Sequence, residues 1–315
     1  MTKRIVDIPD SVRQKAAALG ADGLTWMAGL SDLIAEFERD WQVSVGASLN
    51  GGSESYVAEV VTRDGMEAIL KIAMPPMQGN TVFANEVLAL SIADGRGYAR
   101  LIEYDLNRRA LLMERLGVPL RNLGLSTRAQ IETICATLKE SWVRVPADSA
   151  LHSGTSVAKE LAEFTANLWE QLAGPCTERA LETALRFAER RAAAFDHETA
   201  VLVHGDAHNG NILQNAVKGS KPSLFKLIDP DGIVAEPACD LAIPMREWMD
   251  ELLADPLRLG RERCAFLSHL TGVEKEAIWE WGFMQCMSTG LFLLQLGQEP
   301  LGRQMLRVAD CWAEG

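Results

Sequence analysis

The apolar residues of this chain follow one spacing in its first third and another in the rest. Between residues 41 and 115, three segments alternate apolar and polar side chains and are separated by glycine-containing turns: 43–49, 56–60 and 68–72. Alternation with period two is typical of β-strands that bury one face. After residue 116, apolar residues recur every three or four positions, as in amphipathic helices. The sequence therefore predicts an N-terminal domain that contains a sheet, residues 1–115, and a mainly helical C-terminal domain, residues 116–315.

The N-terminal domain also contains helical patterns. Residues 10–40 have helical spacing before the first strand, and residues 83–95 form a shorter helical segment after the third strand. Two more strands are predicted at 99–104 and 110–114. The expected fold class is α+β, with a five-stranded antiparallel sheet, one helix associated with it, and a helical second half.

Charge and cysteine spacing exclude several classes of protein. The chain has 31 basic and 43 acidic residues, a net charge of −12, so it lacks the positive surface typical of nucleic-acid or anionic-membrane binding. Its six cysteines are far apart and form no C-x-x-C pair, which argues against structural zinc and against a disulfide framework. No stretch approaches the roughly 18 apolar residues of a membrane span. We expect a cytoplasmic protein, monomeric or weakly dimeric.

Residues 201–213, VLVHGDAHNGNIL, interrupt strand-forming apolar residues with polar ones. The apolar run 200–205 and a second apolar run, 224–229, each end in an acidic or polar residue, and we expect these two runs to form a hairpin that brings Asp206 close to Asp229. With Asn211, these carboxylates make an oxygen-rich set of the kind that binds Mg²⁺ bridging phosphates. The set predicts phosphoryl transfer, which needs a base near the accepting hydroxyl, a metal ion and a cation on the nucleotide.

Lys71 is the candidate for that cation. It lies in the apolar strand EAILKIA, where a lysine is expected only if its ammonium has a partner, and Glu86 on the next helix is the candidate partner. An edge-strand lysine in water and a glutamate favoured by the helix dipole are the alternative interpretations. The turn between the first two strands offers close backbone approach and hydroxyl donors for phosphate, through Gly51, Gly52, Ser53 and Ser55.

The order of these features resembles that of protein kinases: strand, glycine turn, strand, Lys71, Glu86, then MERLG, HGDAHNGN and IDPDG. More narrowly, HGDAHNGNIL and IDPDGIVAEPACDLA are similar to the aminoglycoside phosphotransferase family, and most to its branch of streptomycin 6-phosphotransferases and aminoglycoside/hydroxyurea resistance kinases. The resemblance covers about residues 41–310 and implies a bilobal protein-kinase-like fold.

The resemblance implies a role for each of the residues discussed. Asp206 would orient the acceptor hydroxyl and take its proton, while Asn211 and Asp229 would hold Mg²⁺. Lys71 would contact the α- and β-phosphates of ATP, with Glu86 fixing its position. The two histidines of the motif stay outside this set: His204 is interpreted as a packed residue that supports the loop, and His208 as a loop residue near the metal.

The segment LLMERLG would link the lobes. Backbone groups near Glu114 and Leu116 would bind adenine, Met113 would border the adenine pocket, and Asp240 would brace the catalytic loop. The glycine turn lacks the G-x-G-x-x-G of protein kinases, which makes phosphate contacts through Ser53 and Ser55 less certain. Pro230 replaces the phenylalanine of the protein-kinase DFG motif, and no A-P-E motif follows, which argues for a small-molecule acceptor.

In aminoglycoside kinases the acceptor cleft is acidic, because the substrates are cations. The candidates here are Glu247, Asp250, Glu251 and Glu280, for which a solvated helix face is the alternative. The resemblance implies transfer of phosphate from ATP to a hydroxyl of an aminoglycoside such as streptomycin, conferring resistance. The alternatives are another acceptor, such as choline, homoserine, methylthioribose, hydroxyurea or another antibiotic, and a catalytically silent nucleotide-binding protein.

Overall fold

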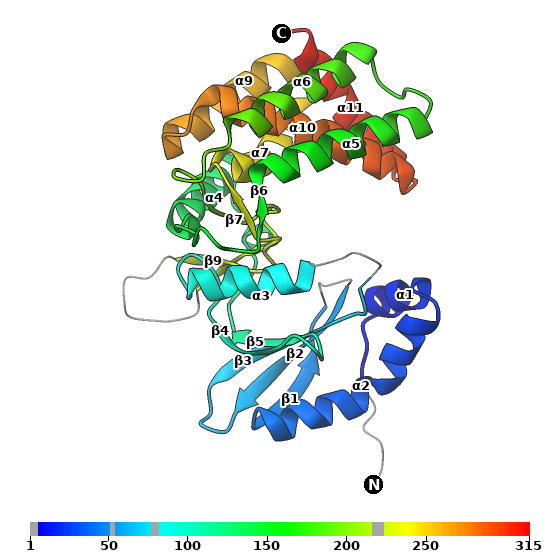
Figure 1. Ribbon diagram of the computed structural model, residues 1–315, viewed down its shortest axis with the longest axis vertical. Helices are drawn as coiled ribbons and strands as arrows, with labels where there is room; N and C mark the ends of the chain where they lie inside the picture. The colour runs from blue at the N-terminus through cyan, green and yellow to red at the C-terminus, as the bar shows by residue number, and fades with distance from the viewer. Residues whose placement is uncertain (1–5, 51–53, 77–81, 216–223) are drawn as a thin grey trace.

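The computed structural model describes residues 6–50, 54–76, 82–215 and 224–315, and it has two lobes (Figure 1). The N-terminal lobe contains a five-stranded antiparallel sheet in the order β1-β2-β3-β5-β4. Its strands are β1 (Val43–Ser48), β2 (Ser55–Thr62), β3 (Glu67–Ala73), β4 (Leu101–Asp105) and β5 (Ala110–Glu114). The predicted five-stranded sheet is therefore confirmed.

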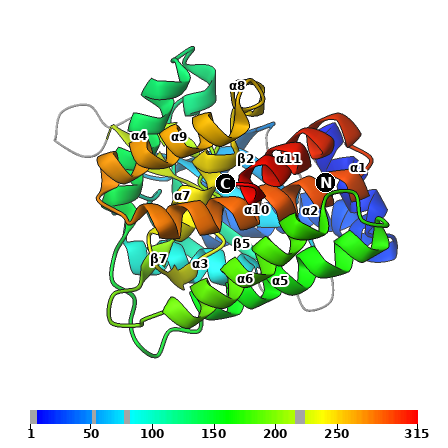
Figure 2. The same ribbon diagram turned by 90° about the horizontal axis from the view of Figure 1, so that it is seen from above.

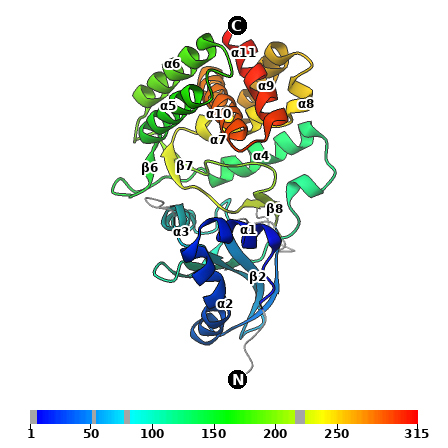
Figure 3. The ribbon, with the colours of Figure 1, turned by 90° about the vertical axis from the view of Figure 1, so that its right-hand side faces the viewer.

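Two helices precede the sheet, α1 (Asp10–Ala18) and α2 (Ala21–Asp40). The helical spacing of residues 10–40 is thus divided at Gly20, whose φ of 66° belongs to the left-handed region that ends helices. A Cβ atom at Gly23 would lie 1.9 Å from the carbonyl oxygen of Ala16, so the two helices meet where a glycine allows the backbones to touch. Figure 3 shows α2 across the outer face of the sheet and α1 at the end of the sheet nearer the other lobe.

The alternation of β3 assigns its side chains to opposite faces of the sheet. Leu70 and its neighbours at period two join the buried cluster made with α1 and α2. Ile69 and Ala73 belong to the other cluster, with α3 (Val82–Ala93) and the C-terminal lobe. Lys71 is two residues from Ile69 and two from Ala73, so its side chain points to the same face of the sheet as theirs, the face toward α3.

The C-terminal lobe is mainly helical, as expected. Its helical elements are η1 (Leu120–Asn122), α4 (Thr127–Ser141), α5 (Gly154–Gln171), α6 (Glu178–Ala194), α7 (Ala238–Arg246), α8 (Met249–Leu252), α9 (Pro256–Thr271), α10 (Lys275–Gln295) and α11 (Glu299–Ala313). Helix α10 is surrounded by α5, α6, α7, α9 and α11 (Figure 2) and is buried on nearly every side. Among the described residues, no helix combines the length and apolar character that crossing a membrane requires.

Short strands carry the polar motifs of this lobe: β6 (His152–Ser153), β7 (Val201–Val203), β8 (Ile212–Gln214), β9 (Phe225–Leu227) and β10 (Ile233–Ala235). The predicted hairpin between the two apolar runs is wrong. Strand β7 pairs with β10, and strand β8 pairs with β9. The chain changes direction within the polar loop 204–211, so β8, and not β7, lies beside β9.

Strand β9 also joins the two lobes. The Leu227 N–H donates to the carbonyl of Gly97, and the Ala99 N–H donates to the carbonyl of Leu227, both at 2.8 Å. Gly97 and Ala99 lie between α3 and β4 of the N-terminal lobe, whereas Leu227 lies two residues before Asp229. The backbone that carries Asp229 is therefore attached to the lobe that carries Lys71.

Candidate active site

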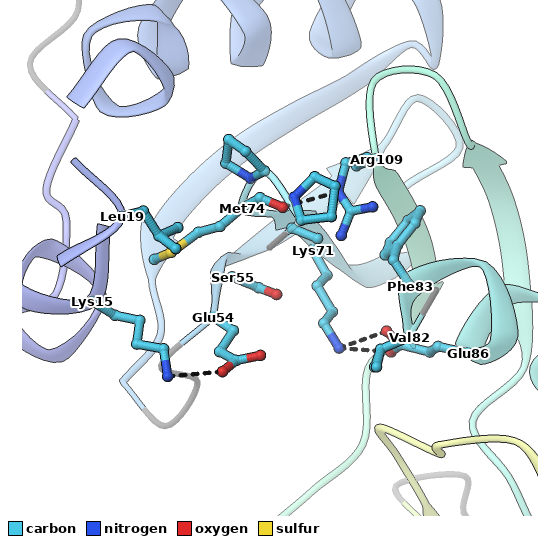
Figure 4. A pocket seen from close by; sticks show the side chains of 13 residues that line it. Lys15, Leu19, Glu54, Ser55, Lys71, Met74, Val82, Phe83, Glu86 and Arg109 are labelled. Atoms are coloured by element: carbon cyan, nitrogen blue, oxygen red, sulfur yellow. Dashed lines mark hydrogen bonds and ion pairs between the residues drawn. The ribbon is translucent and has the colours of Figure 1, made fainter. Parts of the chain in front are cut away.

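Lys71 of β3 faces Glu86 of α3. The Nζ atom of Lys71 lies 2.7 Å from Oε1 and 2.8 Å from Oε2 of Glu86; Glu86 is buried and Lys71 is largely buried (Figure 4). Glu86 lies within the second turn of α3, on the face that packs against the sheet. The partner proposed for the buried ammonium is thus the residue that the structure brings to it.

Asp229 approaches the same ammonium from the other lobe, with 2.9 Å between Nζ of Lys71 and Oδ1 of Asp229. Asp229 follows β9 and has a φ of 57°, a left-handed conformation that aspartate tolerates better than most residues. Strained backbone of this kind is concentrated at functional sites. Burial opposes ionisation here, but Lys71 outweighs it and holds the pKa of Asp229 below its usual value.

The charge balance of this cluster is one cation against two carboxylates. Burial alone would lower the pKa of Lys71, but Asp229 and Glu86 together raise it above its ordinary value. Burial raises the pKa of the Glu86 carboxyl to about 7, with a further contribution from Asp229 that Lys71 only partly offsets. Lys71 is therefore firmly protonated, and the cluster can accept further positive charge.

The loop that carries Asp206 is braced from beneath by Asp240 at the start of α7. The Gly205 N–H donates to Oδ1 of Asp240 at 2.9 Å, and the indole N–H of Trp142 donates to Oδ2 at 2.9 Å. Asp240 is fully buried, and each of its oxygens accepts a hydrogen bond, as buried polar atoms generally do. The bracing role expected for Asp240 has this geometric basis.

His204 supports the same loop from within. Its Nδ1 accepts from the Asp206 N–H at 3.1 Å, so the proton of the neutral ring is on Nε2, which donates to the Ile228 carbonyl at 2.7 Å. The ring is fully buried and stacks on Tyr98, with 6.0 Å between centroids. The interpretation of His204 as a packed supporting residue is confirmed, and the residue links the Asp206 loop to the segment that ends in Asp229.

Asp206 and Asn211 lie on one loop, and the Asn211 side-chain amide donates to the Asp206 carbonyl at 3.1 Å. The Asp206 carboxylate is about two-fifths exposed, so substrates can reach it. Two side chains not assigned to the site from sequence approach its oxygens. Nη2 of Arg246 lies 3.4 Å from Oδ1, and Nε2 of His208 lies 3.6 Å from Oδ2.

Asp231 is a further residue missed by the sequence reasoning. It lines the same cavity as Asp206, and burial with the nearby carboxylates raises its pKa to about 6. The signal was present in the fourth position of IDPDG, but an aspartate in a D-P-D-G turn has an ordinary structural explanation. Arg246 gave no comparable signal, because its proximity to Asp206 depends on the path of α7.

A cavity of about 660 Å³ lies between the lobes and is lined by Lys71, Asp206, Asn211 and Asp229. Apolar side chains line it from both lobes: Leu49, Val57 and Ile69 from the N-terminal lobe, and Leu213 and Ile228 from the C-terminal lobe. The linker residues Met113, Glu114 and Leu116 are also part of its wall. The cavity thus has an apolar part beside the linker and a charged part beside Lys71.

The linker and the glycine turn can be followed only in part. The Glu114 N–H donates to the Arg100 carbonyl at 2.9 Å, and its carboxylate forms an ion pair with Lys226 of β9. Ser55 is buried at the start of β2 and lines the cavity. Gly51, Gly52 and Ser53, which were predicted to contact phosphate, lie outside the described residues.

A smaller cavity of about 100 Å³ shares Lys71, Glu86 and Ser55 with the larger one. Figure 4 shows Lys15 of α1 at its edge, directed toward Glu54, with 3.0 Å between Nζ and Oε1. Helix α1 therefore contacts the residue that directly follows the glycine turn. Both side chains are exposed, so this pair contributes little to stability by itself.

The four acidic residues predicted for the acceptor site do not line the large cavity in the part of the chain that the structure describes. Glu280 lies inside the C-terminal lobe, where its oxygens are 3.0 Å from Nη1 of Arg190 and 2.6 Å from Nε of Arg191. Burial raises its pKa, and the side chain is 1% exposed. Glu280 is thus part of a buried ion cluster, because α10 is central rather than peripheral.

The other three acidic residues lie at and beyond the end of α7. Glu247 pairs with Arg246 at 3.0 Å, and Glu251 lies 3.6 Å from Arg263, whereas Asp250 is exposed. Through Arg246, Glu247 is the member of this set that is connected to Asp206. The acidic character expected around the acceptor is therefore partly offset by an arginine.

The donor set of the cavity fits a magnesium ion shared with phosphates. Among the described residues, no three His, Cys, Asp or Glu side chains converge in the way that a metal held by protein alone requires. Mg²⁺ in nucleotide sites needs only one or two protein oxygens, since phosphates and water supply the rest. The Asp229 carboxylate and the Asn211 amide oxygen satisfy that requirement on chemical grounds.

Comparison with known proteins agrees with this geometry. The family model for aminoglycoside/hydroxyurea antibiotic resistance kinases matches residues 40–297. A streptomycin 6-kinase from Streptomyces glaucescens is 25% identical over 313 residues, covering 98% of each chain. A hydroxyurea phosphotransferase from Kitasatospora aureofaciens is 29% identical over 313 residues, covering 97% of this chain and 86% of the relative.

Solved structures share the architecture. The choline kinase LicA from Streptococcus pneumoniae superposes with a TM-score of 0.61 at 16% identity, covering 91% of this chain and 99% of LicA. LicA in complex with AMP gives a TM-score of 0.56 at 15% identity, covering 90% and 97%. The expected bilobal protein-kinase-like fold is confirmed. The chain is a phosphotransferase with an alcohol group as acceptor, and it belongs to the aminoglycoside/hydroxyurea antibiotic resistance kinase family.

Proposed function

We propose that this chain transfers the γ-phosphoryl group of ATP to a hydroxyl of an aminoglycoside, with streptomycin as the first candidate. The observation that carries the proposal is the 2.9 Å contact between Lys71 and Asp229 in a cavity that Asp206 and Asn211 also line. The relative named streptomycin 6-kinase supports this acceptor. A phosphate dianion on the drug would spoil its cationic fit to ribosomal RNA, and resistance would follow.

ATP would occupy the cavity with its base in the apolar part. Val57 and Ile69 would cover one face of adenine and Ile228 the other, beside the linker. The Glu114 N–H is already bonded to Arg100, so the Glu114 carbonyl and the backbone of Leu116 are the groups proposed to bind the base edge. Residues 1–115 would thus supply most of the nucleotide site, and residues 116–315 the acceptor site.

The charged part of the cavity would receive the triphosphate. Lys71 would contact its α- and β-phosphates, and Glu86 would keep the ammonium on the cavity side. Asn211 and Asp229 would hold Mg²⁺, which when bound neutralises the phosphate charge that otherwise repels an attacking oxygen. The raised pKa of Lys71 supports the assignment, because the ammonium stays charged at every physiological pH.

Asp206 would orient the acceptor hydroxyl and take its proton as the oxygen attacks phosphorus. The transition state of phosphoryl transfer is loose, so this role depends on position more than on base strength. The fixed loop supports such a role, since Asp240 and His204 hold its backbone from two sides. The acceptor would approach from the side of Arg246 and Glu247.

Hydroxyurea is the second candidate acceptor. A hydroxyurea phosphotransferase is 29% identical to this chain over nearly its whole length. The surroundings of Asp206 also support a small uncharged acceptor, because Arg246 and His208 place hydrogen-bond donors and positive charge where a purely acidic site would favour polycations. The two acceptors differ in charge, so a direct comparison distinguishes them.

The test is substrate-dependent release of ADP by the purified chain with ATP and Mg²⁺. Streptomycin, hydroxyurea, choline and homoserine are supplied in parallel, and mass spectrometry locates the added phosphate on the product. We expect streptomycin to give the highest kcat/KM and expression of the chain to protect a sensitive host. Release of ADP that no acceptor stimulates, at the same rate in an Asp206→Ala control, would contradict the proposal.

A further inference from the structure

The two oxygens of the Asp206 carboxylate each have a separate donor nearby. Nη2 of Arg246 lies 3.4 Å from Oδ1, and Nε2 of His208 lies 3.6 Å from Oδ2. The distances are longer than those of strong hydrogen bonds, but contacts of catalytic groups commonly shorten when substrate and metal bind. One donor therefore lies on each side of the carboxylate that is proposed to take the proton of the acceptor hydroxyl.

The hydrogen bonds of His208 determine where its proton lies. Its Nδ1 accepts from the Gly210 N–H at 2.9 Å, so the proton of the neutral ring is on Nε2, the atom that faces Asp206. His208 is therefore a donor toward Asp206, although sequence reasoning placed it outside the chemistry.

Gly210 explains why the ring stays in this orientation. A Cβ atom at this position would lie 2.7 Å from Cε1 of His208 and 2.8 Å from Nη1 of Arg121, so any side chain would displace the imidazole. The conformation of Gly210 is not left-handed, and its lack of a side chain is needed for space alone. The loop is built to hold His208 against its own backbone.

Arg246 is held just as firmly. It occupies the last position of α7, where the helix dipole favours a cation, and its Nη1 lies 3.0 Å from Oε1 of Glu247. The side chain is 14% exposed, and its Nε is buried without a hydrogen-bond partner in the described residues. Glu247 thus contacts Nη1 of Arg246, and Nη2 is the nitrogen that faces the accessible Asp206 carboxylate.

We propose that His208 and Arg246 are positioning residues that hold the Asp206 carboxylate from both sides, so that one free lone pair faces the acceptor hydroxyl. A carboxylate on a single bond rotates, whereas donors on both oxygens fix its plane. Misplacement of a reacting group by about 1 Å can cost on the order of 100-fold in rate. This inference rests on the proposed phosphoryl transfer. It adds two residues to the base, the metal ligands and the lysine to which that reaction has been assigned.

The alternative is that His208 only closes the turn through its bond to Gly210. Two substitutions separate these roles. In His208→Asn the side-chain oxygen takes the place of Nδ1 and keeps the bond to Gly210, but the donor toward Asp206 is lost. In His208→Gln the amide nitrogen takes the place of Nε2 and keeps the donor toward Asp206, but the bond to Gly210 is lost.

We expect His208→Asn to lower kcat by about 10- to 100-fold while the KM for ATP changes little, and His208→Gln to retain most of the wild-type kcat. Arg246→Met should lower kcat by a similar factor, and Arg246→Lys should recover part of the loss. Thermal melting and the affinity for ATP of each variant check that it is folded. The reverse order, with His208→Asn fully active and His208→Gln impaired, would overturn the proposal.

A readout that needs no identified acceptor keeps the two proposals apart. ATP hydrolysis without acceptor uses water in place of the hydroxyl, and the same order of variants is expected for that reaction. If wild-type chain transfers phosphate to an acceptor but all four variants match it in that reaction and in ATP hydrolysis, the positioning role is wrong and the proposed function stands. If wild-type chain neither transfers phosphate to an acceptor nor hydrolyses ATP, both the proposed function and the positioning role that rests on it are wrong.

Discussion

Lys71 and Asp229 lie 158 positions apart in the chain, yet their side chains are 2.9 Å apart between Nζ and Oδ1. One belongs to a strand of the N-terminal sheet and the other follows a strand of the C-terminal lobe. The contact is possible because β9 is hydrogen-bonded to the segment between α3 and β4, which holds the two lobes side by side at this point. The ion pair therefore connects the two halves of the proposed nucleotide site.

Asp229→Asn should weaken the binding of magnesium-loaded ATP by about 10-fold or more. The amide keeps the size of the side chain but removes the charge that is proposed to hold the metal. Titration calorimetry with ATP in the presence and absence of Mg²⁺ measures the effect. An affinity for Mg·ATP equal to that of the wild type would contradict the metal assignment, and Asp250→Asn, an exposed substitution outside the cavity, is the matched control.

Asp206→Ala should lower turnover by several powers of ten and leave ATP affinity nearly unchanged. Asp206 lines the cavity on the acceptor side, and its carboxylate takes no part in the Lys71 cluster. Steady-state kinetics with streptomycin and hydroxyurea, alongside nucleotide binding, separates the two quantities. Turnover at the wild-type level would remove Asp206 from its proposed role.

Glu280→Gln should lower the free energy of unfolding by about 1.5–3 kcal/mol, the range for a lost hydrogen bond to a charged group, and leave the KM for the acceptor unchanged. The substitution removes the closer of two carboxylates that contact the largely buried Arg191, while Glu236 stays 3.3 Å from its Nη1. Chemical denaturation measures the loss. Glu276→Gln is the control. Glu276 pairs at an exposed position with Arg190, which Glu280 also contacts, so this substitution should cost less than about 1 kcal/mol. A raised KM without loss of stability would return Glu280 to the acceptor site.

Asp240→Asn should destabilise the protein by about 1–3 kcal/mol and lower kcat. The amide group has one acceptor oxygen, whereas the carboxylate accepts from both the Gly205 N–H and the Trp142 indole. Removing the indole donor in Trp142→Phe should recover part of the loss in the double variant. Stability and kcat are measured for the two single variants and the double variant, and strictly additive losses would show that the two donors do not compete for the same group.

The six cysteines should react slowly with thiol reagents at pH 8. Burial raises the pKa of Cys135, Cys176 and Cys286 to about 12 and that of Cys264 to about 11. A thiol whose pKa is raised stays protonated until the pH approaches that value, and the thiolate is the reactive form. Reaction with a chromogenic disulfide should therefore need denaturant to reach completion. Fast reaction of all six thiols in the native protein would contradict the burial described here.

The regular elements of the N-terminal lobe could be predicted because their cause is local. The alternation in β3 and the glycine turns indicate strands regardless of what they contact. The division of residues 10–40 into two helices at Gly20 was not predicted, because the helical spacing continues on both sides of it. The pairing of β7 with β10 could not be predicted in this way. It depends on how the chain returns after the polar loop, which no spacing in the sequence records.

The residues of the candidate site likewise fall into those that a local pattern indicates and those whose position depends on the folded chain. Asp206, Asn211 and Asp229 are found by motif, and an apolar strand points to Lys71. The donor role proposed for His208 could not be predicted, because the tautomer of the ring depends on a hydrogen bond to Gly210 that only the folded loop reveals. Glu280 was misassigned because an acidic residue on a helix usually faces water, whereas α10 lies at the centre of its lobe.

The two hydrogen bonds between Leu227 and the segment before β4 have a mechanical consequence. They fix a pivot close to Asp229, so a rotation of the N-terminal lobe would displace nearby atoms least and distant atoms most. Lys71 lies near this pivot, because its Nζ atom is 2.9 Å from Oδ1 of Asp229. A rotation of the lobes about this point would therefore leave the lysine in place beside the aspartate.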